Sequence, residues 1–416
     1  MLASALIHYA NHARFASEPL IPLGSVRRFA PDVGDVSLLG IVPAADHSRA
    51  LDEFGQLRSV FRTLERADSE VTVETERGPV TLHLATPEHA GAALVWHTGS
   101  VAHTRLLQGR ARARGLTFED ARLVDAEGRA VAVRDEAAFY SALSLPFIPP
   151  ELREGMDEVA MAEQGGLPWL VGEPDIRGDL HMHSTWSDGR NPVGEMVVAA
   201  QQLGYEYVAI TDHSERSLAS RKLAAADIPR QRRDIEKVRR RTPGIQVLHG
   251  IEVDIMHDGS LDFSDDQLES FDIVLASLHD HGGHDPQTLT DRYLRAIHHP
   301  LVSVITHPAN RSPARSLGYE VDFDRLFAAA AATGTAMEID GAPGHLDMDG
   351  ALARRAVAMG VTVTINSDCH RADALGRQMR FGIGTARRGW VEAAHVLNTR
   401  SLQEVREFIA RKRGQR

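Results

Sequence analysis

Seven short segments rich in β-branched residues recur between residues 178 and 370, and most of them end in His, Asp or Glu. They are residues 178–184, 207–214, 246–255, 272–280, 302–308, 335–341 and 362–370. Helical stretches separate most of these segments, which is the pattern of parallel strands joined by crossover helices. The sequence therefore predicts a parallel β/α barrel, and such barrels carry their active site at the carboxyl ends of the strands.

Metal-ligating side chains gather at these predicted strand ends. Because alternate residues of a strand point the same way, His181 and His183 project together, as do Asp368 and His370. Cys369, between the last two, is expected to point away from them as a small buried residue. The candidate metal ligands are six histidines and three carboxylates: His181, His183, Asp188, His213, Glu252, His279, His307, Asp368 and His370.

The number and type of these donors indicate the chemistry. A single histidine at a strand end is usually structural, but packing does not explain nine donors in phase at strand ends. Imidazole and carboxylate ligands without thiolate suit Zn, Mn or Fe, and nine donors with one shared carboxylate suit three ions. Water held between two such cations is deprotonated near neutral pH and can attack phosphorus. Phosphoester hydrolysis is therefore the leading reaction class.

Four neighbouring polar residues each have two interpretations. Asp212, beside His213, is a candidate catalytic residue that would orient a ligand, or it caps the strand end. Arg311 is the other candidate catalytic residue and would grip a substrate phosphate or form a surface ion pair. Asp254 and Asp280 share the ambiguity of Asp212.

Five more residues lie outside the nine-ligand pattern. Glu338 and Asp340 end the sixth strand and would bind substrate or close the barrel floor. His284, His298 and His299 lie in loop or helix context and are expected to be solvated. Helix starts are predicted at N-cap residues between the strands. They are Asn191 with Pro192, Asp322, Asp349 and, for the last helix, Ser401.

The motifs DLHMHSTWSDG, ITDHS, GIEVDI, SLHD, THP and NSDCH resemble those of the polymerase-and-histidinol-phosphatase (PHP) family, over residues 176–416. The resemblance implies a distorted (β/α)7 barrel with a trinuclear site, holding Mn2+ and/or Zn2+, with Fe as the third option. It assigns His181, His183, Glu252 and Asp368 to one ion. It assigns Glu252, His279 and His307 to a second ion, and Asp188, His213 and His370 to the third.

The front half resembles the palm and thumb of bacterial family X DNA polymerases, which carry a PHP domain at their C-terminus. The similar segments are residues 24–42, 79–85, 96–107 and 145–155, and ARRGW at 386–390 is also typical of that architecture. The expected organisation is a smaller α+β, nucleotidyltransferase-like palm and thumb remnant at 1–155, a linker at 156–176 and the barrel at 177–416.

The palm-like segment departs from the family pattern. Such a palm needs three carboxylates for two magnesium ions, and here Asp35 remains while Ser37 and Thr81 stand at the other two positions. A hydroxyl cannot supply the lost negative charge, so two cations and a triphosphate would be poorly held. Loss of polymerisation is predicted. Because the palm-like motif begins at residue 24, we also expect no helix-hairpin-helix or fingers region.

Several basic segments are candidate DNA contacts or solvated faces. The turn 97–100 resembles the sugar-contacting turn of the family thumb. Between residues 221 and 241 there are nine Lys or Arg and three Asp or Glu, beside the second barrel strand. The arginines of the front half with the same two interpretations are Arg27, Arg28, Arg105, Arg110, Arg112 and Arg114.

The composition predicts a soluble cytoplasmic protein with no membrane partner. The chain has 416 residues, a net charge of -11 and one cysteine, and no uncharged run reaches membrane-spanning length. The expected activity is phosphodiester hydrolysis on DNA, as a 3′-to-5′ exonuclease or 3′-end-processing enzyme in DNA repair. The alternatives are a small-molecule phosphomonoesterase of the histidinol-phosphatase type and a non-catalytic DNA-binding scaffold.

Overall fold

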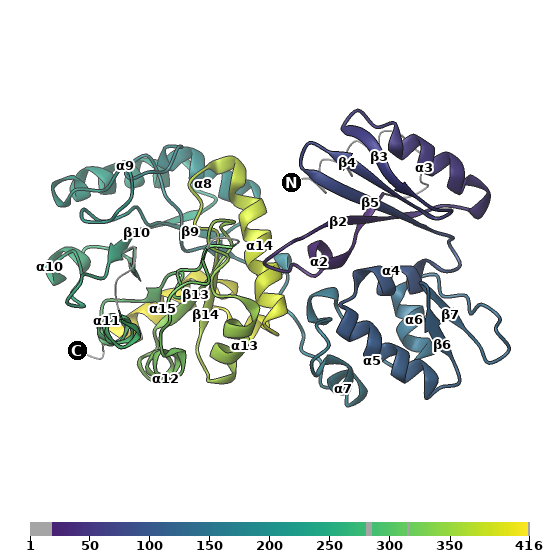
Figure 1. Cartoon of the computed structure of the whole chain (residues 1–416). Coiled ribbons are helices and arrows are strands. Elements are labelled where there is room, and N and C mark those ends of the chain that lie inside the picture. Colours follow the sequence, from purple (N-terminus) through teal and green to yellow (C-terminus); the bar gives the residue numbers. More distant parts are fainter. Residues whose placement is uncertain (1–18, 280–284, 314–315, 415–416) are drawn as a thin grey trace. The chain divides into compact units, whose positions relative to one another are not determined.

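The computed structural model describes residues 19–279, 285–313 and 316–414. The chain divides into two compact units, Met1–Leu167 and Pro168–Arg416, each with its own sheet and apolar core (Figure 1). Asp280 and His284 lie outside the described residues. None of the described helices is long and apolar enough to cross a lipid bilayer.

The first unit is built on a five-stranded sheet with the strand order β1-β2-β5-β4-β3. Strands β2 and β5 pair in parallel, and the other neighbours are antiparallel. One face of the sheet packs Leu38, Val80 and Leu82 against Leu51 and Phe54 of α3. The elements are β1 (Ile21–Pro22), α2 (Gly24–Arg27), β2 (Val36–Ile41), α3 (His47–Gly55), β3 (Val60–Arg66), β4 (Glu70–Thr75), β5 (Gly78–Ala85), α4 (Ala90–Thr98), α5 (Val101–Arg112), β6 (Thr117–Glu119), β7 (Arg122–Val124), α6 (Glu136–Ala142) and α7 (Glu158–Glu163).

Helix α7 lies in the segment 156–176 that the sequence assigned to a linker. Glu158 of α7 lies 2.6 Å from the Nδ1 atom of His103 in α5, and both side chains are buried. The other ring nitrogen of His103 lies 2.9 Å from the hydroxyl of Tyr140 in α6. The first part of this segment is therefore packed into the first unit.

The second unit is the distorted (β/α)7 barrel that the sequence predicted. Its seven strands are parallel and follow chain order from β8 to β14. A parallel bridge between Met182 and Cys369 joins the chain after β8 to the chain after β14. The elements are β8 (Gly178–Asp179), α8 (Val193–Gln202), β9 (Tyr207–Ile210), α9 (Ile228–Arg241), β10 (Gln246–Asp254), α10 (Asp265–Leu268), β11 (Ile273–Ser277), α11 (Pro286–His298), β12 (Val304–Ile305), α12 (Phe323–Thr333), β13 (Ala336–Asp340), α13 (Gly350–Ala358), β14 (Val363–Asn366), α14 (Leu375–Arg388) and α15 (Leu402–Arg413).

Two apolar clusters hold the barrel together. The larger one fills the space between the strands and the surrounding helices and includes Cys369, as expected. In the smaller one, Val405, Phe408 and Ile409 of α15 pack with strand residues such as Leu275. The apolar side chains near the strand beginnings are thereby covered, and the carboxyl ends are left for polar residues.

The predicted N-caps explain where several barrel helices begin. The side chains of Asp322, Asp349 and Ser401 accept backbone hydrogen bonds from the first turns of α12, α13 and α15. Helix α8 differs, because Pro192 occupies its N-cap position without a side-chain bond. Asn191 instead donates its amide to Glu195 at 2.6 Å.

Candidate metal centre

All nine predicted ligands converge at the carboxyl ends of the barrel strands. Glu252 lies in β10 and Asp188 in the loop after β8, and the others follow their strands closely. His181, His183 and Glu252 are fully buried. The remaining six line one pocket of about 270 Å3: Asp188, His213, His279, His307, Asp368 and His370.

The most buried group contains His181, His183, Glu252 and Asp368. The Nε2 atoms of the two histidines are 3.1 Å apart, and they lie 3.5 and 3.6 Å from Glu252 Oε2. Asp368 Oδ1 lies 3.5 Å from His181 Nε2 and 3.0 Å from His183 Nε2. A divalent ion with bonds of about 2.0 to 2.2 Å spaces its donors by about 3.0 to 3.6 Å. His181, His183 and Asp368 offer donor atoms within 4.8 Å of one another and fit one ion, and Glu252 lies beside them.

The other donors form two overlapping groups that differ in part from the assignment implied by the resemblance: His183, Asp188, His213 and His370, and His213, Glu252 and His279. His307 lies beside the second of these groups. Glu252 Oε1 lies 3.1 Å from His307 Nε2 and 3.7 Å from His279 Nε2. Glu252 thus presents one oxygen to the first group and its other oxygen to the second. In the third group, Asp188 Oδ1 lies 3.1 Å from the Nε2 atom of His370 and 3.6 Å from that of His213.

Two carboxylate oxygens of this cluster face histidine nitrogens without a well-aligned hydrogen bond among the described residues. Glu252 Oε2 and Asp188 Oδ1 are buried and lie 2.7 Å from His213 Nδ1 and 3.1 Å from His370 Nε2. An unsatisfied buried carboxylate oxygen is costly, and a coordinated cation removes that cost. The donor set and its unpaired oxygens fit a site for divalent cations.

The charges within the cluster balance one another. Burial opposes the charged form of His279, but Glu252 and Asp254 outweigh it and raise its pKa to about 9. Burial likewise opposes ionisation of Glu252, while His213 and His181 hold its pKa well below the usual range. Protons on histidines thus occupy the role that cations would take, and metal binding would release them.

Two carboxylates orient the ligand histidines from behind. Glu338 Oε1 lies 2.8 Å from the Nδ1 atom of His181, and Asp254 Oδ1 lies 2.8 Å from that of His279. A carboxylate on Nδ1 fixes the ring so that Nε2 faces the metal and is a better donor. From the sequence, Glu338 was expected to bind substrate or to close the barrel floor, and its contact with His181 shows that it orients a ligand. The signal was a carboxylate ending a strand between two ligand-bearing strands.

Asp212 holds a loop and does not contact a candidate ligand through a hydrogen bond that the structure describes. Its carboxylate accepts five hydrogen bonds, from the backbone and hydroxyl groups of Ser184 and Ser187 and from the amide of Gln231. These bonds fix the turn that precedes Asp188. The geometry assigns Asp212 a positioning role for that loop.

Arg311 is not brought into the pocket. Its guanidinium lies 4.0 Å from Asp349, and the residue is not among those that line the ligand pocket. The structure thus agrees with the ion-pair interpretation of Arg311. His298 and His299 also lie outside the pocket, with His298 bonded to the carbonyl of Leu294 and His299 3.2 Å from Asp265.

Two ligand residues have unusual backbone geometry. His307 and Asp368 have φ angles of 27° and 46°, in the left-handed region that is rare for residues other than glycine. Such conformations persist where the surrounding structure enforces them, and they cluster at functional sites. The sequence carries no signal for this feature.

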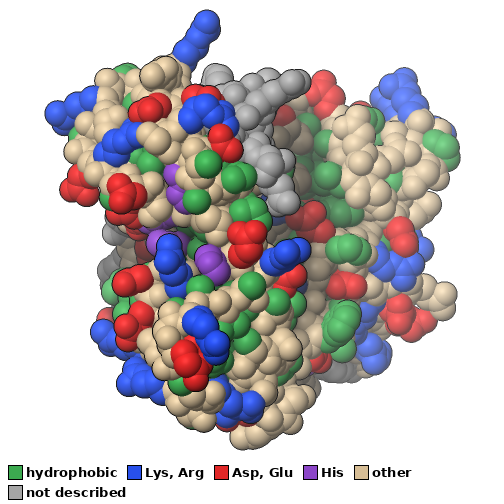
Figure 2. All heavy atoms as spheres, turned by 90° about the vertical axis from the view of Figure 1, so that its right-hand side faces the viewer, with side chains coloured by type: hydrophobic (Ala, Val, Ile, Leu, Met, Phe, Trp, Pro, Cys, Tyr) green, Lys and Arg blue, Asp and Glu red, His purple; other side chains and the backbone are tan. Residues whose placement is uncertain are grey.

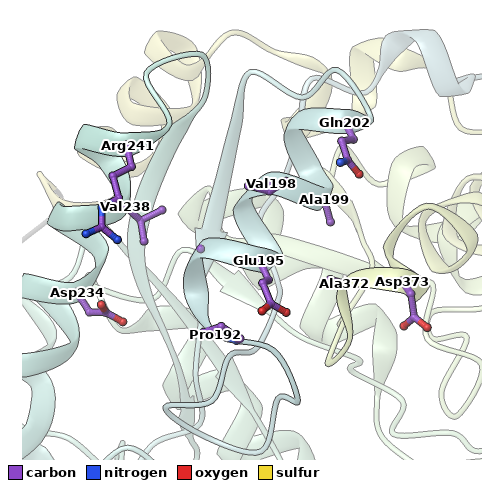
Figure 3. A pocket seen from close by; sticks show the side chains of 11 residues that line it. Pro192, Glu195, Val198, Ala199, Gln202, Asp234, Val238, Arg241, Ala372 and Asp373 are labelled. Carbon is purple, nitrogen blue, oxygen red and sulfur yellow. The ribbon is translucent and has the colours of Figure 1, made fainter.

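A second and larger groove lies elsewhere on the barrel unit. It has a volume of about 670 Å3 and lies between α8 and α9, with Val198 and Val238 among its apolar lining (Figure 3). Its acidic residues, which include Glu195 and Asp234, already bond to Asn191 and Trp186. The candidate chemistry therefore belongs to the smaller pocket that the ligands line.

The palm-like sheet contains only part of a cation site. Ser37 of β2 lies directly opposite Thr81 of β5 in the parallel pair. Ser37 donates to Asp35 at 3.2 Å, and the Thr81 hydroxyl lies 2.9 Å from that of Thr72. Asp35 is thus the one carboxylate among the three positions that the resemblance identified.

Three of the predicted DNA-contact arginines are held by acidic residues. Arg27 forms two bonds to Glu136, at 2.8 and 2.6 Å, and Arg28 lies 3.1 Å from Glu154. Arg110 of α5 bonds to Glu163 at 2.8 Å.

The other three arginines of this group, Arg105, Arg112 and Arg114, are exposed. Arg114 follows α5 and donates to the hydroxyl of Ser144. On the face shown in Figure 2, basic and acidic side chains are interspersed. The front half therefore offers scattered basic groups on this face instead of one strongly basic patch.

Comparison with known proteins identifies both units. Residues 93–154 match the model of the DNA polymerase beta thumb, and residues 179–308 match that of the PHP domain. The chain is 35% identical over 394 residues to DNA polymerase/3'-5' exonuclease PolX of Bacillus subtilis (strain 168), covering 93% of this chain and 68% of the relative. This chain belongs to the bacterial family X DNA polymerases that carry a PHP domain.

Other relatives match about half of this family X chain. A probable phosphatase of Shewanella oneidensis is 32% identical over 210 residues, which are 48% of this chain and 78% of the relative. A probable phosphatase of Syntrophotalea carbinolica is 29% identical over 207 residues, 47% of this chain and 81% of the relative. PHP domains are metal-dependent phosphoesterases that bind several divalent ions, and the His and Asp clusters of this barrel could hold such ions.

Proposed function

We propose that the chain is a metal-dependent phosphodiesterase that acts on 3′ ends of DNA, as a 3′-to-5′ exonuclease or 3′-end-processing enzyme in repair. The observation that carries the proposal is the complete set of nine donors at one pocket, with Glu252 facing two of the donor groups at once. The Bacillus subtilis relative is named both polymerase and 3'-5' exonuclease. The nine donors of this chain support the second of these activities as the proposal.

The donor groups would hold three divalent cations, Mn2+ and/or Zn2+ or Fe, with Mn2+ as the preferred activator. Such cations, when bound, lower the pKa of water and neutralise charge on the phosphoryl oxygens. The chain supplies the orientation. Glu338 and Asp254 hold the Nδ1 atoms of His181 and His279, so both Nε2 lone pairs face the centre. Complete burial of Glu252 keeps its charge unscreened.

The loop after β9 supports a nucleic-acid substrate. Leu218 and Ala219 line the ligand pocket, and the Leu218 side chain is 56% exposed. An exposed apolar side chain beside a phosphate site suits a base or a deoxyribose. Arg221 donates to the carbonyl of Gly189, next to a ligand, at 2.9 Å, and Lys222 is exposed. Both cations are placed to contact phosphates that flank the scissile one.

Helix α9 extends this basic surface. Its buried side chains are Ile228, Gln231, Ile235 and Val238, so its cations lie largely on the opposite side. The exposed cations of the helix are Arg230, Arg233, Lys237, Arg240 and Arg241. A single strand lying along α9 would be held by charge without any reading of sequence.

Polymerisation is proposed to be lost. Asp35 alone cannot neutralise two magnesium ions beside a triphosphate, and the hydroxyls of Ser37 and Thr81 carry no charge. The palm and thumb would then serve as a platform that binds DNA for the barrel.

The second candidate function is a small-molecule phosphomonoesterase. It is favoured by the probable phosphatases that match about half of this chain at 32% and 29% identity. The same cations and ligands would hydrolyse a monoester, so only the substrate separates the two proposals.

The test measures full-length protein with Mn2+ on single-stranded and nicked DNA carrying a 5′ label, and on p-nitrophenyl phosphate. Progressive shortening from the 3′ end is expected. Cleavage of the monoester with intact DNA would make the protein a phosphatase, and no cleavage of either would make it a scaffold. Arg221→Glu combined with Lys222→Glu should raise KM for DNA about 10-fold and leave the monoester unchanged. Arg406→Glu with Arg411→Glu on α15 is the control of equal charge change.

A further inference from the structure

A fourth donor group lies beside the three that the nine ligands form. It consists of Asp340 at the end of β13, His345 in the loop that follows, and Asp368 after β14. One donor atom from each residue lies within 4.8 Å of the other two. Asp340 and His345 are not among the nine predicted ligands.

Two atoms of this group are buried and unsatisfied. Asp340 is completely buried, and its Oδ1 atom accepts a bond from the backbone of Ala342 at 2.6 Å. Its Oδ2 atom and the Nδ1 atom of His345 have no hydrogen-bond partner among the described residues. A buried carboxylate oxygen without a partner is costly, so its retention points to a ligand that this chain does not itself supply.

The third donor of the group is already part of the main cluster. Asp368 Oδ1 faces the Nε2 atoms of His181 and His183 at 3.5 and 3.0 Å. A carboxylate has two oxygens and can bridge two cations, as Glu252 is placed to do between its groups. A cation next to Asp340 would also offset the repulsion between two buried carboxylates that face the same space.

The position of His345 connects this group to the ligand pocket. His345 lines the pocket with His279, His307 and His370, and its ring stacks on that of His307 with 4.9 Å between centroids. The stacking holds the imidazole of His345 at the edge of the pocket. A cation bound there would face the space that a substrate enters.

We infer that Asp340, His345 and Asp368 hold an additional divalent cation beside the nine-donor cluster. Two carboxylates and one imidazole suit Mn2+ or Zn2+, and three protein ligands leave positions open for water or substrate oxygens. It has three protein ligands and shares one of them, Asp368, with the first group, so this cation should bind more weakly than the cation of that group. The inference concerns metal binding alone and is independent of which phosphoester is hydrolysed.

The experiment measures bound Mn2+ in full-length protein by elemental analysis after equilibrium dialysis over a range of Mn2+ concentrations. Wild-type protein is expected to bind four equivalents, the last one more weakly. Asp340→Asn and His345→Gln should each remove one equivalent and leave three. Asp266→Asn and His298→Gln, two exposed positions, are the matched controls and should keep four. A wild-type protein that saturates at three, or a variant that loses more than one, would overturn the inference.

Anomalous diffraction at the manganese edge gives an answer that does not depend on the folding of any variant. Crystals of wild-type protein soaked in Mn2+ should show a peak between Asp340 and His345, separate from those beside Glu252. Absence of that peak while the others are filled would contradict the inference. The nuclease proposal is tested by DNA cleavage, so its failure would leave this metal count unaffected.

Discussion

The palm-like sheet and the barrel both place polar side chains where parallel strands lie side by side, but only the barrel retains the charge to hold cations there. In the first unit, Ser37 lies opposite Thr81, and one carboxylate remains. In the second, Glu252 faces two donor groups at once. The palm-like sheet keeps its shape because its other face packs apolar residues against α3. The fold of this sheet therefore does not depend on the carboxylates that a cation site would need.

The largest expected effect tests the retained site. Glu252→Gln should lower kcat/KM for phosphoester hydrolysis by about 10^3-fold, since an amide replaces the charge that two donor groups share. Bound Mn2+ should fall in the same variant. Glu407→Gln on the exposed side of α15 is the control. If kcat/KM of Glu252→Gln stayed within a factor of about two of the wild-type value, the barrel site would not be the catalytic site.

A smaller effect on activity is expected from Glu338, which contacts the ligand His181 from behind. Glu338 contacts only hydrogen-bond donors in the described structure: His181 Nδ1, the backbone of His307 and the amide of Asn366. Glu338→Gln should therefore lower metal affinity and activity by about 10- to 100-fold, because one of these donors would face an amide N–H. Metal titration followed by a rate measurement at saturating Mn2+ separates the two effects. Full activity at low Mn2+ would be inconsistent with this role, and Glu320→Gln is the exposed control.

The donors of the barrel could be predicted because their signal is local. His181 and His183 are two residues apart in the segment that follows β8, and an extended chain brings alternate side chains together without any knowledge of the rest of the fold. The N-caps Asp322 and Asp349 are local in the same way. The barrel then follows from the repetition of short apolar strands and helices.

The supporting contacts could not be predicted, because they join distant parts of the sequence. Glu338 lies 157 residues from His181, and no spacing rule connects them. Asp212 sits beside a ligand in sequence, yet its bonds go to Ser184, Ser187 and Gln231. The same reason applies to Arg27. From the sequence, its partner could have been a DNA phosphate or an acidic residue, and in the structure it pairs with Glu136, 109 residues away.

The palm-like sheet offers a reverse test. Ser37→Asp with Thr81→Asp would place carboxylates on a paired position of β2 and β5. Together with Asp35, they would make three carboxylates. In about 10 mM Mg2+ the melting temperature of this variant should rise about 2 to 4 °C more than that of wild type, because the cation offsets the added repulsion. Ser37→Asn with Thr81→Asn adds similar volume without charge and should respond like wild type. If Mg2+ changed the melting temperature of all three proteins equally, the missing carboxylates would not explain why this sheet lacks a cation site.

The smallest effect compares histidines of the two units. Burial lowers the pKa of His97 to about 3, helped by the neighbouring His83, whose ring stacks on it at 3.9 Å. Near His97, no group offsets the effect of burial as strongly as the carboxylates do that raise the pKa of His279.

The pKa of His97 in the folded protein lies below its value of 6.5 in the unfolded chain. The stability that this difference contributes is therefore present above pH 6.5 and is lost as pH falls toward 3. Between neutral pH and about pH 4, the free energy of unfolding of His97→Gln should therefore fall by about 2 kcal/mol less than that of wild type. Urea unfolding of the full chain measures this difference. Both proteins carry the same barrel, so metal effects cancel in the difference. If the free energies of unfolding of the two proteins changed in parallel with pH, His97 would be protonated in the folded state at low pH. Burial would then not separate His97 from His279, and only the carboxylates near His279 would distinguish the two histidines.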